Sequence, residues 1–230
     1  MSTLSRTLRR AALVVFSAAV LSACGSLLGP TEAPPQIYVL KPQFGPVADA
    51  PATTWQIAVP APNVPDVFDT KRIALQRGQT MDYYANAAWT DQTGELVQDL
   101  LVEALEKSGK VKAVGPTSGG VRADLLVVTE VRDFAAHYSS ENGAPDVVVD
   151  LVAKLITANH HDVVATFDAR REAQAGANSI PAVVQAFNQA TGEAIRDIVG
   201  WTLNNATPKA TDALPPTTAA PVHRRRHRRN

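Results

Sequence analysis

Apolar residues repeat every three or four positions over two stretches, and this spacing predicts amphipathic helices. The first stretch covers residues 94–107, where Thr93 is placed to cap the start and Gly109 follows the end. The second covers residues 181–203, where a proline in the first turn and Ser179 before it suit a helix start. The predicted buried stripes are Leu96, Val97, Leu100, Leu101, Ala104 and Leu105 in the first helix, and Val183, Phe187, Ala190, Ala194, Ile198 and Trp201 in the second.

Three segments between these helices have the patterns of strands. Residues 123–136 begin with a nearly continuous apolar run, which predicts a central strand covered on both faces. Residues 146–156 and 162–169 alternate between apolar and polar, and the short connection over residues 157–161 predicts an antiparallel pair. The predicted inward positions are Val147, Val149, Leu151, Ala153 and Leu155 in one strand, and Val163, Ala165 and Phe167 in the other.

Shorter strands are expected before the first helix. The candidates are residues 36–40, 55–59, 71–76 and 81–89, with a turn at residues 77–79. Runs of strands with two long helices predict an α+β fold, an α/β sandwich in which the helices pack on one mixed or mainly antiparallel sheet.

The N-terminus has the layout of a secretion signal. A basic start with Arg6, Arg9 and Arg10 precedes an apolar run over residues 11–21 and then small residues. A helix of this length is too short for a bilayer core, which needs about 20 residues. We therefore expect residues 1–23 to be a signal peptide that is removed.

Cys24 follows this run in the sequence Leu-Ser-Ala-Cys, which resembles the lipobox of bacterial lipoproteins. The resemblance implies cleavage before Cys24, which becomes the new N-terminus, and attachment of a diacylglycerol to its thiol, with palmitate among the acyl chains, so that the lipid is the membrane anchor. The alternative is a buried free cysteine without a role. Because Cys24 is the only cysteine, a disulfide within the chain is excluded. The serine at position 26, where an aspartate favours inner-membrane retention in enterobacteria, implies the outer membrane rather than the inner one.

Composition divides the rest of the chain into three parts. Residues 24–36 are rich in glycine and proline and suit a lipidated tether, whereas residues 37–205 hold the predicted domain. Residues 25–205 contain 13 Lys and Arg against 21 Asp and Glu, a net charge of −8. Such an acidic domain is a poor binder of nucleic acid, because that affinity comes mostly from neutralising phosphates.

Residues 206–230 form a Thr-, Pro- and Ala-rich linker and a basic tail, both predicted to be disordered. The tail arginines are Arg224, Arg225, Arg226, Arg228 and Arg229. Near an anionic surface each contributes on the order of 1 kcal/mol, which suggests binding to anionic lipid or lipopolysaccharide. The alternative is a solvated tail that aids solubility. Deletion of residues 223–229 is expected to weaken binding to anionic vesicles at low salt if the first interpretation holds.

The sequence offers little catalytic chemistry. His160, His161 and Asp162 are adjacent, but neighbouring strand residues point to opposite faces, so a surface turn is favoured over a metal site. His137 lies close to two serines in sequence, yet the chain contains no nucleophile elbow, metalloprotease motif or phosphate-binding loop. We therefore expect a protein that is not an enzyme, with no cofactor and no metal.

Three aromatic residues on one predicted strand are the candidates for partner contacts. Alternation places Tyr83 on the same face as Trp89, with Tyr84 on the opposite face. Aromatic side chains dominate many interfaces. The favoured alternative is that Trp89 and one tyrosine belong to the core.

Several segments, in their order, resemble the ABC-type transport auxiliary lipoprotein family. The resemblance covers most of residues 24–203, and its segments are Cys24, Ile37-Tyr38-Val39-Leu40, Phe68-Asp69-Thr70-Lys71-Arg72-Ile73, Tyr83-Tyr84-Ala85-Asn86-Ala87-Ala88-Trp89, residues 95–108, residues 123–134 and Val184-Gln185-Ala186-Phe187-Asn188-Gln189-Ala190.

The family implies an accessory lipoprotein at the periplasmic face of the outer membrane. It would dock a lipid conduit formed by a mammalian-cell-entry-domain protein of an ABC transporter, as part of an oligomeric complex. A periplasmic lipid-binding carrier remains the alternative. The two differ in one observable, because a carrier purifies with bound lipid and a docking subunit purifies empty.

Overall fold

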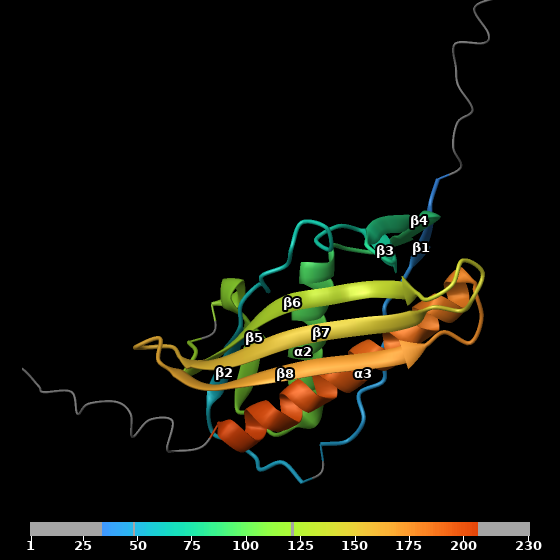
Figure 1. The fold of residues 1–230 in the computed structure, drawn as a ribbon. Helices are drawn as coiled ribbons and strands as arrows, with labels where there is room; N and C mark the ends of the chain where they lie inside the picture. Colours follow the sequence, from blue (N-terminus) through green and yellow to red (C-terminus); the bar gives the residue numbers. More distant parts are fainter. Residues whose placement is uncertain (1–33, 48, 121, 207–230) are drawn as a thin grey trace, which may run out of the picture. The chain divides into compact units, whose positions relative to one another are not determined.

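In the part of the chain that the structure describes, eight strands form one mixed sheet, and two long helices pack against one of its faces (Figure 1). The computed structural model describes residues 34–47, 49–120 and 122–206, and those of them from Pro35 onward belong to one compact unit. The strands are β1 (Gln36–Tyr38), β2 (Gln56–Val59), β3 (Arg72–Arg77), β4 (Thr80–Trp89), β5 (Ala113–Pro116), β6 (Leu125–Tyr138), β7 (Asp146–Thr157) and β8 (Val163–Gln174), and the helices are α2 (Thr93–Ser108), the short 3₁₀ helix η2 (Thr117–Gly119) and α3 (Ile180–Asn205). The predicted α+β fold is confirmed.

Strand β6 organises the sheet. One of its edges pairs antiparallel with β7 along nearly its whole length, and β7 pairs antiparallel with β8, as the hairpin connection predicted. The other edge is shared, because β2 pairs parallel with its start and β3 pairs parallel with its end. Between them, Asn63 forms an isolated bridge to Glu130, so the connection from β2 to β3 fills the gap.

The prediction that the β6 segment is covered on both faces was wrong. Helices cover only one face of β6, β7 and β8, and the other face lies open in Figure 1. From Leu125 to Arg132, burial along β6 accordingly alternates between buried and intermediate or exposed positions, whereas the three residues 134–136 are all buried. The apolar run reflects the central place of the strand in the sheet rather than a second covering layer.

Helix α2 begins one residue earlier than predicted. Its N-cap is Gln92, so Thr93 is not the cap but a buried residue of the first turn. The end is as predicted, because Gly109 adopts the left-handed conformation with φ 62° and its N–H donates to the carbonyl of Glu106. The predicted apolar stripe faces inward, except that Leu96 is only partly buried.

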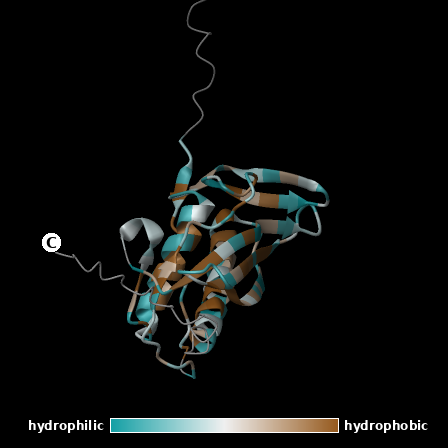
Figure 2. Cartoon of the chain, turned by 90° about the vertical axis from the view of Figure 1, so that its left-hand side faces the viewer, coloured by the Kyte–Doolittle hydropathy of each residue, from teal (hydrophilic) through white to brown (hydrophobic). Residues whose placement is uncertain are grey.

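Helix α3 packs on β7 and β8. Ser179 is its N-cap, although its side chain forms no capping hydrogen bond, and a proline lies in the first turn. The predicted stripe from Val183 to Ile198 is buried, and at its end Trp201 stacks on Phe167 of β8 with ring centroids 5.6 Å apart. Figure 2 shows hydrophobic residues gathered where strands and helices face one another.

Strand β8 departs from prediction in length and at its start. It continues to Gln174, beyond the predicted end. Val163 was predicted to point inward but is 57% exposed, because a register shift between Leu155 and Ile156 of β7 changes the alternation at the start of β8. The shift leaves one additional residue, Val164, on β8, and an additional residue reverses the face on which the side chains beyond it lie.

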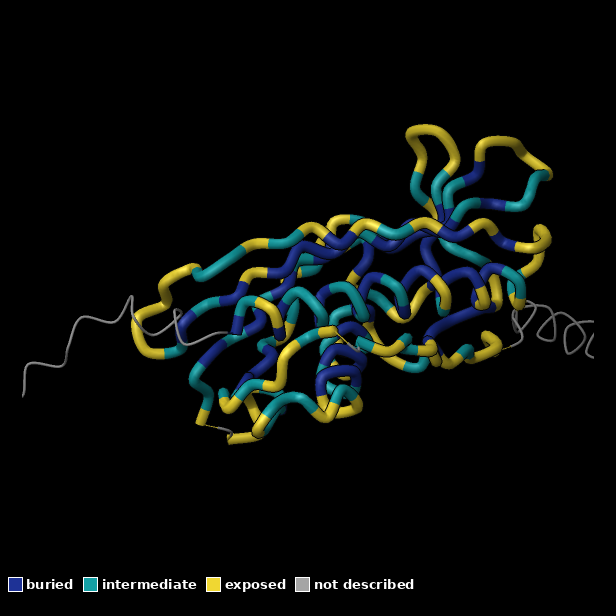
Figure 3. The backbone as a smooth tube through the Cα atoms, turned by 90° about the horizontal axis from the view of Figure 1, so that it is seen from below, coloured by how far each residue is buried: buried dark blue, intermediate teal, exposed yellow. Residues whose placement is uncertain are grey.

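Residues 41–50, which we call the strap, cross α3 on the helix side of the domain. Position 48 lies outside the described residues. The strap touches α3 at Gly192, where a Cβ atom would stand 2.8 Å from the carbonyl oxygen of Gln43. The backbone N–H of Lys41 also donates to the side-chain oxygen of Asn188 at 2.6 Å. Figure 3 shows buried segments concentrated between the sheet and the helices. Within the part of the chain that the structure describes, no helix combines the length and apolarity needed to cross a membrane.

Candidate functional site

Tyr84, Tyr138 and Asn178 form a hydrogen-bonded chain where β4, the end of β6 and the start of α3 meet. The Tyr138 hydroxyl donates to Asn178 Oδ1 at 2.8 Å, and the two tyrosine hydroxyls are 2.8 Å apart. Since a phenol has one proton to donate, Tyr84 is the donor to Tyr138. Burial, and then the bond to Tyr138, raise the pKa of Tyr84 well above its usual value. Tyr84 is therefore a structural group whose hydroxyl is engaged inside the domain.

Tyr83 lies on the opposite face of β4 from this chain. The guanidinium of Arg72 lies over its ring, 3.8 Å from the centroid, and its hydroxyl donates to the carbonyl of Val67 at 3.1 Å. The side chain is partly buried, and Arg72 is exposed beside it. Tyr83 and Arg72 together present an aromatic and cationic surface at this end of the sheet.

The prediction that Tyr83 shares a face with Trp89 was wrong. Asn86, between them, has a positive φ of 54°, and the pairing of β3 with β4 shifts register between Arg72 and Ala74. This irregularity reverses the alternation, so Tyr84 and Trp89 both point toward the helices. Asparagine tolerates positive φ better than most residues, and it was the one local signal for the irregularity.

Trp89 lies inside the core with 1% of its surface exposed. Its ring packs edge-on against Phe187 of α3 and Phe134 of β6, at centroid distances of 5.2 Å and 6.4 Å. The favoured alternative from the sequence, a core role for Trp89, agrees with this position. Trp89 is therefore a core residue, too buried for direct contact with a partner.

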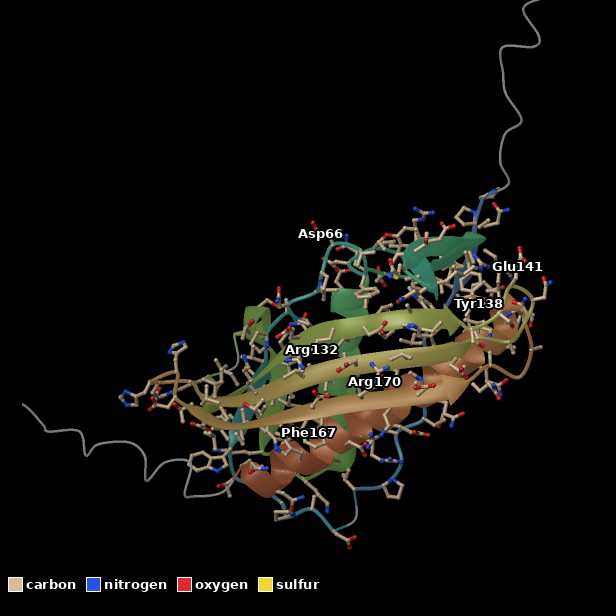
Figure 4. The ribbon with its side chains drawn as sticks, viewed as in Figure 1. Asp66, Arg132, Tyr138, Glu141, Phe167 and Arg170 are labelled. Carbon is tan, nitrogen blue, oxygen red and sulfur yellow. The ribbon has the colours of Figure 1, made fainter. Side chains whose placement is uncertain are left out.

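The open face of β6 and β7 carries a partly buried charge cluster that the sequence reasoning missed. His137 Nε2 lies 2.9 Å from Asp133 Oδ2, and Arg170 Nη1 lies 3.4 Å from Asp150 Oδ2. Asp133 and Asp150 are direct cross-strand partners, and their Oδ1 atoms are buried with no hydrogen-bond partner among the described residues. Figure 4 labels Arg170 on this open face, near Arg132.

Burial raises the pKa of the Asp133 carboxyl, and His137 opposes this rise through a hydrogen bond and its charge. The cluster contains a histidine and two carboxylates, but His137 contacts Asp133 rather than a serine. Within the described ranges, no group of three or more metal-binding side chains converges. His160 and His161 are exposed in a turn closed by a 2.9 Å bond from the Thr157 N–H to the Asp162 carbonyl, as predicted.

Three shallow grooves lie along the strap, and all three are lined by Arg196 of α3. Their volumes are about 410, 400 and 430 Å³. Another groove, of about 330 Å³, adjoins His137 and Arg170 on the open face. Each volume is in the range of small-molecule sites, and each groove is open to the surface.

Two predicted sites lie outside the described residues. These are the lipidation site Cys24 and the basic tail with Arg224, Arg225, Arg226, Arg228 and Arg229. Their roles stay predictions from the sequence.

Comparison with known proteins connects this architecture to a family. The model of a family described as ABC-type transport auxiliary lipoprotein component matches residues 38–199, more than half of the chain. The structure is similar to that of protein XCC0632 from Xanthomonas campestris, at 27% sequence identity and a TM-score of 0.71, covering 78% of this chain and 99% of that chain. A second solved structure, of an uncharacterized protein, shares the fold at 15% identity and a TM-score of 0.57, covering 73% and 97%. No curated protein matches the chain.

Proposed function

Because the chain belongs to the ABC-type transport auxiliary lipoprotein component family, we propose that it docks a lipid conduit at the outer membrane. The conduit would be a mammalian-cell-entry-domain protein of an ABC transporter, and this chain its non-enzymatic periplasmic accessory subunit. The observation that carries the proposal is the family match across almost the whole folded domain. Family membership implies partners in a transport system; the identity of the partner and the membrane are proposed.

The anchor in this proposal is Cys24. The lipobox-like sequence before it supports cleavage and acylation, and Ser26 supports the outer membrane. The folded unit starts within about a dozen residues of Cys24, so a tether of at most about 40 Å would connect lipid and domain. The domain therefore stays close to the membrane surface.

A filled interior favours docking over carrying. The space between the sheet and the helices is occupied by Trp89, Phe134 and Phe187, all with 1% or less of their surface exposed. The described grooves are shallow and hold at most about 430 Å³. A carrier needs a cavity that shields the acyl chains of its cargo, and this core leaves them no interior space.

The surface that we propose for the partner is the end of the sheet around Tyr83 and Arg72. An exposed cation stacked on an aromatic ring provides both apolar contact and charge, which suits an interface anchor. Trp89, through its contact with Phe187 of α3, and Tyr84, through its bond to Tyr138 of β6, would support this surface from beneath. The oligomeric state in the complex follows from the partner and stays a prediction.

The decisive experiment uses the acylated full chain as bait in detergent-solubilised envelope. Mass spectrometry then identifies the captured proteins and lipids. Capture of a mammalian-cell-entry-domain protein without stoichiometric phospholipid supports docking. Bound phospholipid without such a protein supports the carrier alternative and contradicts the proposal.

Two variants separate anchoring from docking. Cys24→Ser is expected to move the chain from the membrane to the soluble fraction, and persistence at the membrane contradicts the lipid anchor. Tyr83→Ala is expected to weaken capture of the partner about ten-fold while leaving the membrane fraction unchanged. Thr80→Ala, an exposed position on the same strand, is the matched control and should capture the partner normally.

A further inference from the structure

We infer that the groove between the strap, the end of α2 and α3 binds the phosphate-bearing headgroup of an anionic lipid in the membrane surface. This groove has a volume of about 410 Å³. The lining residues that carry the inference are Phe44 and Val47 of the strap, Lys107 and Lys110 at the end of α2, and Arg196 and Val199 of α3. The inference rests on the proposed lipid anchor, but not on the proposed protein partner.

The charge of the lining is the first argument. Residues 25–205 carry a net charge of −8, yet this groove is lined by Lys107, Lys110 and Arg196 and by no acidic residue. A concave surface lined by one sign of charge concentrates ligands of the opposite sign. The groove is therefore a positive site on an acidic domain, which suits a phosphate group.

The three cations are held at different depths. The ammonium of Lys110 donates to the carbonyl oxygens of Val47, at 2.8 Å, and of Ala50, which fixes its charge beneath the strap. Arg196 is held by Asp197, through Nε at 3.2 Å and Nη2 at 3.1 Å. Asp197 also pairs with Arg171, so its charge is shared between two arginines. The groove thus keeps fixed positive charge when it is empty.

Lys107 is the adjustable group at the rim. Its side chain is 62% exposed, and it pairs with Glu103 one helical turn earlier. An exposed pair of this kind contributes only about 0.3–0.5 kcal/mol, so Lys107 can turn from Glu103 toward a phosphate at little cost. Its ammonium lies 5.5 Å from the centroid of the Phe44 ring, which directs it over the groove.

The apolar half of the lining points to a lipid rather than to a free anion. Phe44 and Val47 of the strap and Val199 of α3 provide apolar surface beside the cations. Lysine side chains with apolar neighbours are typical of membrane interfaces, where the stem is buried and the ammonium meets the headgroup. A phosphate with attached glycerol and acyl carbons matches both halves of the groove.

The position of the groove fits a membrane ligand. Phe44 lies eight residues after Gln36, the start of β1, and Cys24 lies twelve residues before it. An extended chain of this length spans at most about 70 Å, and the tether itself at most about 40 Å. The groove is therefore within reach of the bilayer to which Cys24 would be attached.

Lys107 and Lys110 also have a purely structural explanation. Both lie at the C-terminal end of α2, where cations offset the partial negative charge of the helix dipole. That explanation predicts that their removal changes stability but not lipid contact. The test therefore measures both properties.

The test uses the full acylated chain incorporated into nanodiscs, with incorporation checked by co-elution. Discs of phosphatidylcholine alone are compared with discs that contain one quarter phosphatidylglycerol. The readout is hydrogen–deuterium exchange of peptides covering residues 41–47 and 104–110. Phosphatidylglycerol is expected to slow their exchange about five-fold, since each cation near the headgroups contributes about this factor. Failure of the chain to co-elute with the nanodiscs would contradict the lipid anchor, and this outcome is distinct from a failure of the groove to bind lipid.

Lys107→Gln and Arg196→Gln are each expected to remove most of this slowing, with melting temperature measured in parallel. Arg132→Gln, which removes an exposed cation on the open face of the sheet, is the matched control and should retain it. Deletion of residues 223–229 should also retain it, and loss of slowing there would assign the contact to the tail instead. Equal exchange in both disc types overturns the inference. Equal slowing by inorganic phosphate with phosphatidylcholine discs overturns the membrane source.

Discussion

Two neighbouring residues of β6 show how differently the two faces of this sheet are built. Phe134 points toward the helices and is 1% exposed, packed 5.0 Å from the ring of Phe187. Asp133, beside it, lies on the open face among His137, Asp150 and Arg170. Apolar packing fixes the covered face, whereas the open face keeps partly buried charges at a cost in free energy. The comparison teaches that the large buried side chains of these strands lie on the covered face, whereas the open face combines buried alanine and valine with charged groups.

Phe134→Ala should give the largest effect, because it removes a buried ring from the covered face. A loss of about 3–5 kcal/mol in the free energy of unfolding is expected. Urea denaturation measures it, and Arg132→Ala on the open face is the control, with a loss within about 1 kcal/mol. Similar losses of stability at both positions would contradict the conclusion that the two faces of the sheet differ in their contribution to stability.

Gly192→Ala should come next, since it tests how closely the strap approaches the covered side. A Cβ at Gly192 would stand 2.8 Å from the backbone oxygen of Gln43, so the strap must shift, at a cost of about 1–3 kcal/mol. Gly200→Ala is the matched control on the same helix, because its Cβ would meet Val47 at an ordinary 3.7 Å. There, higher helix propensity should stabilise by up to about 1 kcal/mol. Thermal unfolding should therefore show a lower melting temperature for Gly192→Ala and a higher one for Gly200→Ala.

Tyr84→Phe should have a moderate effect, because it removes the donor at the start of the hydrogen-bonded chain to Asn178. A loss of about 1 kcal/mol is expected in urea denaturation. Tyr38→Phe removes an exposed hydroxyl bonded only to nearby Gln36, and its effect should be within about 0.5 kcal/mol. If Tyr38→Phe costs as much as Tyr84→Phe, the buried chain has no special role.

Asp133→Asn should have the smallest effect and the opposite sign. The folded-state pKa of Asp133 is raised, so its contribution to stability is present below the unfolded-state pKa and is lost as pH rises through the folded-state pKa. At neutral pH the variant should be more stable by up to about 1 kcal/mol, despite losing the contact with His137. The gain should shrink on acidification, as measured by urea denaturation at several pH values. A gain independent of pH would contradict this assignment.

Much of the covered face could be predicted from the sequence. The periodicity of α2 and α3 and the alternation of β7 identified buried residues because burial imposes those periods directly. Gly109 and the proline at the start of α3 marked helix ends for equally local reasons. Strand β5 was missed because two of its four residues are a glycine and a proline, which are depleted in strands and typical of turns.

The functional candidates depended on features that no local pattern contains. Asn86 reversed the alternation that had placed Tyr83 beside Trp89. Tyr84 bonds to Tyr138, and Tyr138 to Asn178, although the three are distant in sequence; Tyr84 of β4 reaches Tyr138 of β6 because β3 pairs with both strands. The grooves along the strap likewise need α2 and α3 in place before they exist.

Because β1 is a short strand that pairs parallel with β4, a force applied to the N-terminal side of the domain would disrupt its contacts one after another. Only three residues of β1 pair, so a pull on Gln36 would strip this strand first, and extend the linkage without unfolding the core. The next point of resistance is the bond between Lys41 and Asn188, and after it the contact of the strap with Gly192. Both contacts are with α3, so a pull on the strap would next act on this helix. If Cys24 is the membrane anchor as proposed, β1 is a short segment that can detach under load while the rest of the domain stays folded.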